Sequence, residues 1–269
     1  MALNTRIQTM KIQKIKNHWN ELAAAAEHSY KASWDDYYML QKEIAEISNN
    51  IQCTASICDM GCNNGYCDFE LLKRHDKLRI TGIDFSEKAI EQANKIRDDS
   101  PYKERCTFLV GNILDVNSYP ADKFDTIIVK RTLINLISDE AQLQAVHNLF
   151  SMVWCGGNVI IMEAVEENLQ RLNKLRAAFD LPDLVQPWHN RYLSKSVVNK
   201  LSLDFCVSHD DDYSSSYYVL SRVVYPWIAK ITNSNVEYLN EINRVAMLLP
   251  NFGDYGIQRI FILYRNGEI

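Results

Sequence analysis

Residues 57–65 read I-C-D-M-G-C-N-N-G, and this stretch decides the fold. A short apolar run ends in an acid, Asp59, and the chain then turns through Gly61 and Gly65 before helical periodicity begins near Asp68. Glycine lets a backbone pass close to a ligand, and the first turn of a helix offers it free N–H groups. Asn63 lies within the turn and accepts a positive φ better than most residues. The chain has only nine glycines in 269 residues, about half the usual frequency of ~7%, so this pair predicts a binding loop.

Outward from this turn, short apolar runs alternate with amphipathic stretches. The alternation predicts βαβ units and an α/β fold with a doubly wound, mostly parallel sheet, helices on both faces and a ligand at the carboxyl ends of the strands. A final apolar run predicts a last, antiparallel strand. The predicted strands are 56–59, 79–84, 107–110, 125–129, 158–163 and 258–264, and the predicted helices between them are 68–75, 87–98 and 139–153.

Two regions depart from this regular pattern. Residues 10–50 read as helical, so we expect residues 1–50 to form an N-terminal helical flap ahead of one domain, 51–269. The pattern begins near Met10, which leaves open whether Met1 or Met10 is the native start. After Glu163 we expect two insertions, at about 164–200 and 210–255, that form a substrate cap. They contain a helical stretch near 166–179, a plausible strand at 204–208, a Tyr-rich segment and a helix at 236–249.

Charge and cysteine usage narrow the class of protein. The net charge of -5 and the absence of a Lys/Arg block argue against nucleic acid as a partner. Seven cysteines form no Cys-x-x-Cys pair and no Cys/His cluster, so neither a disulfide framework nor a metal site is expected. The first residues lack the apolar core of a signal peptide, and no run reaches the ~18 apolar residues of a membrane span. We therefore expect a cytoplasmic protein without a membrane partner.

Polar residues follow the second and third predicted strands. Asp84 ends the second strand, where a carboxylate can bind two adjacent ribose hydroxyls. The third strand runs into Gly111, Asn112 and Ile113, so that an amide can meet an adenine edge and an apolar side chain its face. Because the first loop is not G-x-G-x-x-G, a Rossmann dehydrogenase fits poorly.

These residues resemble the class I S-adenosylmethionine-dependent methyltransferase superfamily. The resemblance covers about 54–163, and 258–264 resembles the family's final antiparallel strand. It implies a seven-stranded Rossmann-like fold, S-adenosylmethionine as cofactor, S-adenosylhomocysteine as product, and no metal. In two places the sequence departs from the family: Asn63 stands where glycine is common, and Asn112 replaces the commoner Asp. The resemblance places the methionine part near Asp59, Gly61, Cys62, Asn63 and Gly65, ribose on Asp84, adenine against Phe85, Asn112 and Ile113, and the sulfonium near Lys130.

Known acceptor chemistries of this superfamily find no match. There is no Asn/Asp-Pro-Pro-Tyr after the fourth strand, where V-K-R-T (129–132) stands instead, and no Pro-Cys nucleophile. Carboxylates of the metal-dependent catechol type are also missing there, and Glu166-Glu167 is not the paired-glutamate loop of protein arginine methyltransferases.

Three motifs remain: K-R-T-L-I-N-L (130–136), E-x-x-x-x-x-L-N-x-L-R (166–176) and L-P-x-x-x-x-P-W-H-N-R-Y-L (181–193). Their combination resembles bacterial small-molecule methyltransferases of surface-polysaccharide and natural-product pathways. In that setting His189 is the candidate general base, because it titrates near neutral pH. Trp19, Tyr30 and Trp34 are candidates to close over the cofactor. The candidate acceptor-binding residues are Arg131, Glu163, Asn173, Arg176, Trp188, Asn190 and Tyr192.

The function expected from the sequence is methyl transfer to an oxygen of a small polar metabolite. In-line displacement with help from a base would act on a sugar, a nucleotide-sugar or a phosphorylated polysaccharide precursor. N-methylation of a small metabolite or natural product is the close alternative. An RNA or protein acceptor, or an inactive cofactor-binding scaffold, is less favoured. We expect a monomer or a homodimer.

Overall fold

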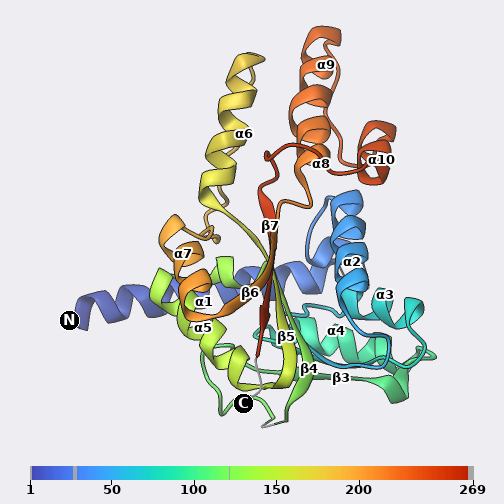
Figure 1. Cartoon of the computed structure of the whole chain (residues 1–269), viewed down its shortest axis with the longest axis vertical. Coiled ribbons are helices and arrows are strands. Elements are labelled where there is room, and N and C mark those ends of the chain that lie inside the picture. The colour runs from blue at the N-terminus through green and yellow to red at the C-terminus, as the bar shows by residue number, and fades with distance from the viewer. Residues whose placement is uncertain (1, 27–28, 121, 266–269) are drawn as a thin grey trace.

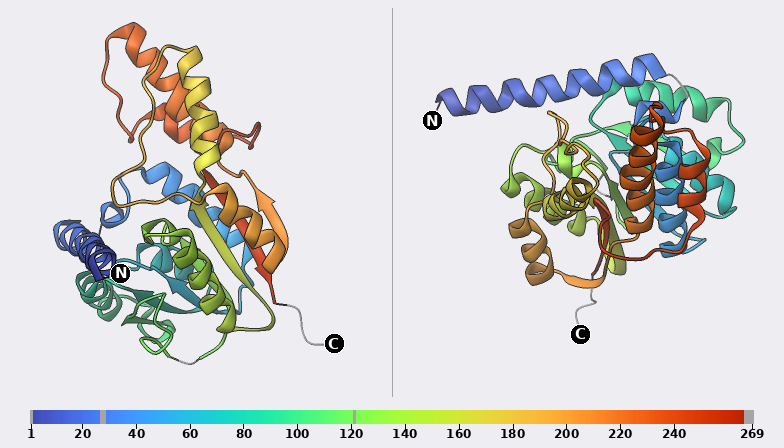
Figure 2. Two further views of the ribbon diagram at one scale, coloured as in Figure 1. Left: turned by 90° about the vertical axis from the view of Figure 1, so that its left-hand side faces the viewer. Right: turned by 90° about the horizontal axis from the view of Figure 1, so that it is seen from above.

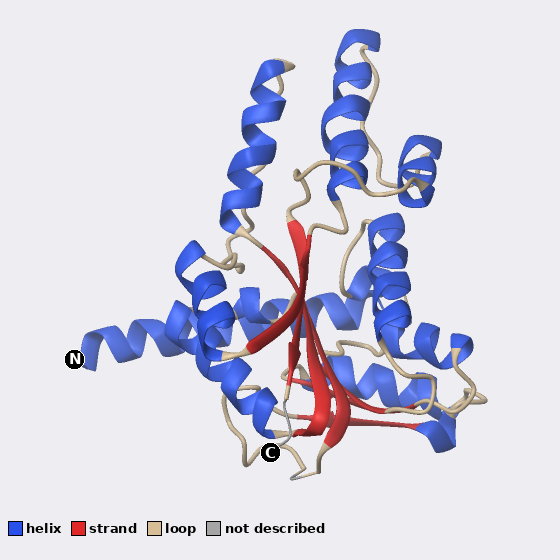
Figure 3. Ribbon diagram, in the orientation of Figure 1, coloured by secondary structure: helices blue, strands red, loops and turns tan. Residues whose placement is uncertain are grey.

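The computed structural model describes residues 2–26, 29–120 and 122–265. Its centre is a seven-stranded sheet in the order β3-β2-β1-β4-β5-β7-β6, shown in Figures 1 and 3. The first five strands along this order are parallel, and β7 is antiparallel to both of its neighbours. This confirms the predicted doubly wound sheet. The strands are β1 (Ser56–Met60), β2 (Arg79–Asp84), β3 (Cys106–Val110), β4 (Phe124–Lys130), β5 (Val153–Ala164), β6 (Cys206–Asp211) and β7 (Gln258–Tyr264).

The sheet separates two hydrophobic cores, and alternating side chains of its central strands point into one or the other. Ile57 and Ile128 face one core, and Cys58 and Ile127 face the other, because successive strand residues point to opposite faces. The first core includes α2 (Tyr37–Asn50), α3 (Tyr66–Arg74) and α4 (Glu87–Asp98), and the second includes α5 (Asp139–Ser151) and α7 (Lys195–Asp204). All five helices bury apolar residues against the sheet.

Capping residues in the sequence determine where the helices at the carboxyl end of the sheet begin. Ser86 and Ser138 accept hydrogen bonds from the backbone N–H groups of Ala89 and Ala141, so they cap α4 and α5. Gly65 precedes α3 in the left-handed conformation, with φ 75°, which glycine adopts without a steric penalty. The helix starts therefore gather beside the strand ends, where the site was predicted.

The N-terminal segment forms two helices joined around η1 (Tyr30–Ala32). The first, α1 (Ala2–Ala26), begins earlier than the pattern near Met10 predicts, and Met1 lies outside the described residues. Figure 2 shows α1 running along one side of the molecule, with its N-terminal end projecting beyond the body. Within the described part of the chain, no helix has the length and apolarity needed to cross a bilayer.

The segments after β5 rise beyond the carboxyl end of the sheet, where α6 (Glu166–Ala178) and α9 (Tyr225–Thr232) stand as two arms in Figure 1. Between β6 and α9 lie α8 (Ser215–Val219) and a π-helix, η4 (Leu220–Val224). The last helix, α10 (Glu241–Leu248), starts after the N-cap Asn240 rather than at residue 236. We call α6, α8, η4, α9 and α10 the cap. The plausible strand at 204–208 is instead β6, shifted to Cys206–Asp211.

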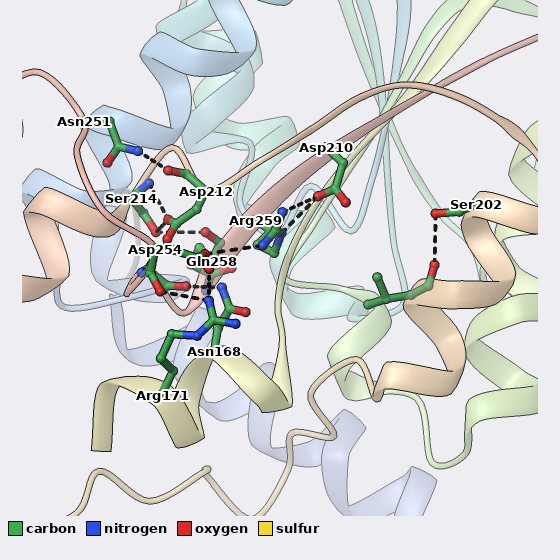
Figure 4. Close-up of polar contacts among 12 residues, drawn as sticks. Asn168, Arg171, Ser202, Asp210, Asp212, Ser214, Asn251, Asp254, Gln258 and Arg259 are labelled. Carbon is green, nitrogen blue, oxygen red and sulfur yellow. Dashed lines mark hydrogen bonds and ion pairs between the residues drawn. The ribbon is translucent and has the colours of Figure 1, made fainter. Parts of the chain in front are cut away.

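Polar contacts fasten the base of the cap to the sheet (Figure 4). The Asp212 carboxylate accepts hydrogen bonds from the backbone N–H groups of Ser214 (3.1 Å) and Gly256 (2.7 Å). Asn168 of α6 donates to the Gly256 carbonyl at 2.6 Å, and the Ser214 hydroxyl donates to the carbonyl of Gln258 at 2.8 Å. These bonds join three segments at one point: the start of α6, the turn between β6 and α8, and the chain that enters β7. A Cβ on Gly256 would lie 1.9 Å from Asp212 Oδ1.

Gly256→Ala should therefore lower the free energy of unfolding by about 1–3 kcal/mol, because the Asp212 carboxylate must move. Urea unfolding of the four members of the cycle Gly256→Ala, Asp212→Ala and both together measures this. The alanine at 256 should cost at least about 0.5 kcal/mol less in the Asp212→Ala background, where the clash with the carboxylate is gone and only the 2.2 Å approach to Ser214 Oγ remains. Strictly additive effects would contradict this account of the junction.

Candidate functional site

A large cavity opens at the carboxyl ends of β1, β2 and β4, where the sequence predicts the ligand. About 1190 Å³ of space lies between its lining residues, open solvent at the mouth included, and concave clefts of this kind are where proteins bind small molecules and cofactors. Residues of the glycine loop line it, as do Asp84, Phe85, Asn112, Ile113 and Lys130. The side chains of Ile12, Ile15 and Trp19 on α1 close it on another side.

The glycine loop is held close to two neighbouring strands. The N–H of Gly61 donates to the carbonyl of Ile83 on β2 at 2.7 Å. Its φ is 93°, and a Cβ there would lie 1.9 Å from Thr132 Oγ1, so only glycine fits. Asn63 has φ 52°, which confirms the predicted positive φ. The side chain of Asn63 also donates to the Ala32 carbonyl at 3.1 Å, joining this loop to the N-terminal segment.

Asp84 presents a largely enclosed carboxylate to the cavity. Its two oxygens each accept one backbone N–H, from Asn63 and Ser86, at 2.8 Å. Burial raises the pKa of Asp84 to about 6 against the opposing effect of these hydrogen bonds. A carboxylate oxygen can accept more than one hydrogen bond, so both oxygens keep capacity for a diol.

The predicted adenine-binding residues line the same cavity. Phe85 follows Asp84, and the Lys16 ammonium of α1 lies 4.5 Å from the centre of its ring. Asn112 accepts the N–H of Leu114 on its side-chain oxygen at 3.0 Å, which fixes the turn after β3. Ile113 is buried beside it. The cavity wall therefore combines an aromatic ring, an aliphatic side chain and an amide.

Asp59 lies behind the cavity wall rather than in it. Its carboxyl is buried near that of Asp68 on α3, and burial raises the pKa of both groups. The positive charge of Lys130 opposes this effect on Asp59, and Lys130 itself lines the cavity at the end of β4. Asp59 can therefore act on the site through the charge of Lys130.

Arg131 lines the cavity and ties β4 to the N-terminal segment. Its guanidinium donates to the carbonyl and the hydroxyl of Ser33, at 3.3 and 2.8 Å. It also lies 3.3 Å from the buried carboxylate of Glu43 and 4.8 Å from the centre of the Trp34 ring. The charge of Arg131 is thereby already balanced by Glu43.

Glu163, predicted to bind the acceptor, supports the loop after β4 instead of lining the cavity. Its Oε1 accepts the backbone N–H groups of Thr132 and Leu133, both at 2.7 Å. Burial raises the pKa of Glu163 to about 8. This buried acid therefore places Thr132 opposite Gly61.

The other predicted acceptor residues belong to the cap or to the loop 181–193, outside the cavity lining. The side chains of Asn173 and Arg176 on α6 donate hydrogen bonds to the backbone carbonyls of Leu184 and Pro182. These bonds hold the loop 181–193 against α6. Tyr192 is largely buried, and burial raises its pKa to about 12. The backbone carbonyl of Asn190 accepts a hydrogen bond from the side chain of Gln186. The structure brings none of these four to the cavity.

His189 lies one side chain away from the cavity. Its ring centre is 4.5 Å from that of His18 and 5.5 Å from that of Trp19, which does line the cavity. Trp188, half exposed, has the Lys14 ammonium 4.5 Å from its ring centre. Burial, and then His18, lower the pKa of His189 to about 4. The predicted base is therefore a weak one, and it contacts α1 rather than the reacting space.

Sequence reasoning missed several cavity residues, which lie on α1, α2 and α3, before α2 and α3, near the ends of β1 and β2, and in the loops after β3 and β4. A signal existed for α1, because Ile12, Ile15 and Trp19 are spaced as one helical stripe. The others come together only through long-range contacts. The Trp19 indole donates to the side-chain oxygen of Asn135 at 3.1 Å, which fixes α1 over the cavity. The missed lining residues are Ile12, Ile15, Ser33, Leu40, Met60, Asn64, Tyr66, Cys67, Ile83, Leu114, Thr132, Asn135, Leu136 and Ile137.

The raised pKa of Glu163 predicts a pH-dependent stability. Below its ordinary pKa of 4.5, Glu163 is protonated in both the folded and the unfolded state. Between pH 4.5 and about 8 the unfolded state gives up this proton while the folded state keeps it, so the free energy of unfolding falls as pH rises. Glu163→Gln keeps an oxygen for the two N–H groups and cannot ionise. The difference in unfolding free energy in favour of this variant should therefore grow between pH 5 and pH 8, measured by urea unfolding.

Glu166→Gln is the matched control, since Glu166 is exposed three residues later. Its difference from the parent protein should stay flat over the same range. A flat difference for Glu163→Gln as well would contradict the raised pKa.

Comparison with known proteins agrees with this geometry. A family model described as a methyltransferase domain matches residues 51–241, more than half of the chain. The protein-lysine N-methyltransferase EFM4 of Saccharomyces cerevisiae is 27% identical over 131 residues, which cover 44% of this chain and 57% of that protein. The malonyl-[acyl-carrier protein] O-methyltransferase 1 of Ilyobacter polytropus is 27% identical over 131 residues, covering 47% and 46%. This chain spans about half the length of these curated relatives.

A solved structure extends the likeness over the whole fold. The N-methyltransferase NodS of Bradyrhizobium japonicum, in complex with S-adenosyl-L-homocysteine, superimposes with a TM-score of 0.58. The match covers 96% of this chain and 99% of that one at 14% identity, and at that identity it bears on the fold alone. The family model, which matches more than half of the chain, shows that the chain belongs to the class I S-adenosylmethionine-dependent methyltransferases, and the solved structure shows the same fold.

Proposed function

We propose that this protein transfers a methyl group from S-adenosylmethionine to an oxygen of a small polar metabolite. The observation that carries the proposal is the shared cavity of Gly61, Asp84, Asn112 and Lys130 at the carboxyl ends of the parallel strands. It supports an assignment that follows the order of the strands: methionine part, ribose, then adenine.

The residues present fit such a cofactor. Asp84 keeps free acceptor capacity for two hydroxyls beside its backbone partners. Gly61 leaves the space that a Cβ would fill. Phe85 and Ile113 supply apolar surface for the adenine ring of the cofactor. When bound, S-adenosylmethionine supplies a methyl group on a positively charged sulfur, which an acceptor atom displaces in line.

The acceptor would approach from the side of Lys130 and Arg131, beneath the cap. We propose that α1 serves as a flap over the cofactor and that the cap bounds the acceptor. The net charge of -5 favours a small molecule over a nucleic acid as the acceptor. The cationic side chains of Lys130 and Arg131 would suit a sugar, a nucleotide-sugar or a phosphorylated precursor, and a cytoplasmic location suits such acceptors.

Alignment is the main catalytic contribution that this geometry supports. Holding two reactants in line can supply several kcal/mol. A hydroxyl acceptor also needs a base, for which His189 was the sequence candidate. Because His189 contacts Trp19 rather than the cavity, we propose that it acts on the reaction through the position of α1.

N-methylation is the second candidate. The yeast relative is a protein-lysine N-methyltransferase and NodS is an N-methyltransferase by name. An amine that reacts in its neutral form needs no strong base in the cavity, and burial leaves His189 a weak one. Product analysis with a hydroxyl and an amine version of the same acceptor separates the two.

Asp84→Ala should weaken S-adenosylhomocysteine binding about tenfold or more, because two hydrogen bonds to a charged group are lost, each worth about 1.5–3 kcal/mol. Isothermal titration calorimetry on folded protein measures the change. Asp76→Ala, at an exposed acid outside the cavity, is the control and should bind as the parent does. Unchanged affinity in Asp84→Ala would refute the ribose assignment.

The same site makes affinity depend on pH. With a pKa of about 6, the Asp84 carboxylate takes up a proton as pH falls, and the affinity for S-adenosylhomocysteine should drop between pH 7 and pH 5. Asp84→Asn should show a weak but flat affinity over that range. A parent protein with flat affinity would show that this carboxylate does not bind the ligand.

A further inference from the structure

A buried carboxylate, Asp36, joins the cap to the segment that touches the glycine loop. Asp36 is completely buried at the start of α2, where its Oδ1 caps the helix by accepting the N–H of Met39 at 3.2 Å. The same oxygen accepts the hydroxyl of Tyr217 at 2.5 Å, and Oδ2 pairs with the guanidinium of Arg222. Both partners belong to the cap, more than 180 positions away in the sequence.

The π-helix in the cap makes this pairing possible. Ser221, Arg222 and Val223 are all buried, which is more than one narrow face of an α-helix presents in succession. A π-turn widens the helix, and such turns occur often at functional sites. The Arg222 guanidinium thereby lies within a buried region beside the rings of Tyr218 and Tyr238, at 5.7 and 4.6 Å from their centres.

On its other side, Asp36 ends a short segment, residues 29–36, that contacts the cavity at several points. The Ser29 carbonyl accepts the side chain of Asn64 at 3.0 Å. The Ala32 carbonyl accepts the side chain of Asn63 at 3.1 Å. Ser33 binds Arg131 through its carbonyl and its hydroxyl and itself lines the cavity. Two residues of the glycine loop and the residue after β4 are thus set by this segment.

We propose that Asp36, Arg222 and Tyr217 are positioning residues that couple the cap to the cofactor loop. The cap holds one end of segment 29–36, and the segment holds Asn63, Asn64 and Arg131. Seating the cap therefore orders the cofactor site. The inference rests on the proposed function, because the loop that the segment positions is the one assigned to S-adenosylmethionine.

Burial explains why this contact is a charged one. A buried carboxylate left without a partner is costly, so Asp36 stays in place only while the cap supplies Arg222. An apolar contact would hold the two parts together over a range of positions. A carboxylate that accepts hydrogen bonds from α2 and from two cap residues at once fixes one position.

The test compares variants that remove the link without leaving an unpaired buried charge. The double variant Asp36→Asn with Arg222→Met removes both charges and keeps an N-cap, since Asn caps helices as well as Asp. Tyr217→Phe removes only the hydroxyl. Arg259→Met is the matched control, because Arg259 pairs with Asp210 and Asp254 at the base of the cap (Figure 4). Within the described residues, neither its hydrogen bonds nor its ion pairs reach segment 29–36. Thermal unfolding must show each variant folded at the assay temperature.

Two readouts are taken on each protein: calorimetric affinity for S-adenosylhomocysteine, and hydrogen exchange of the peptide 57–69 without ligand. We expect the double variant to lose affinity about tenfold, which is a typical coupling between sites, and to exchange faster in 57–69 but not in β5. Tyr217→Phe should change both readouts in the same direction by a smaller factor, and Arg259→Met should change neither.

Folded variants with unchanged affinity and unchanged exchange would overturn the coupling and leave the proposed function intact. If the parent protein binds no S-adenosylhomocysteine, the proposed function fails, and exchange alone decides the coupling. Faster exchange in 57–69 then supports it, and unchanged exchange overturns it.

Discussion

The site depends on the parallel pairing of β1 with β2 on one side and β4 on the other. In this register Met60 lies beside Ile83 and Val129, so the three strands end at one level. The hydrogen bond from Gly61 to Ile83 then starts the loop directly above β2, next to Asp84. Because Gly61 has no side chain, Thr132 in the loop after β4 approaches from the other side. Any residue with a Cβ at position 61 would push these strand ends apart.

Buried acids then fix what the strand register brings together. Glu163 holds the loop after β4, Asp212 holds the base of the cap, and Asp36 joins the cap to the N-terminal segment. Each accepts hydrogen bonds from backbone or side-chain donors on elements far apart in sequence. Without those donors, burial would make the carboxylates unfavourable, so they specify one arrangement of flap, loop and cap.

The residues of the cofactor loop could be predicted because their signals are local. Gly61 and Asn63 sit at a turn that needs unusual backbone angles, and Asp84 ends a strand that alternation alone reveals. The roles of Arg176, His189 and Glu163 could not be predicted in this way. Arg176 donates to the backbone carbonyl of Arg222 in η4, and the partners of the other two lie in α1 and in the loop after β4. No spacing in the sequence indicates those contacts. For Asp36 and Arg222 the partner is 186 positions away, and the π-turn that buries Arg222 leaves no simple periodic pattern.

The central claim is that the cavity binds S-adenosylmethionine, and calorimetric titration of the purified protein tests it most directly. The ligands are S-adenosylmethionine, S-adenosylhomocysteine and, as a dinucleotide control, NAD. The account predicts micromolar binding of the first two, with one site per chain, and no binding of NAD. Binding of NAD, or binding of neither adenosyl ligand by folded protein, would contradict it.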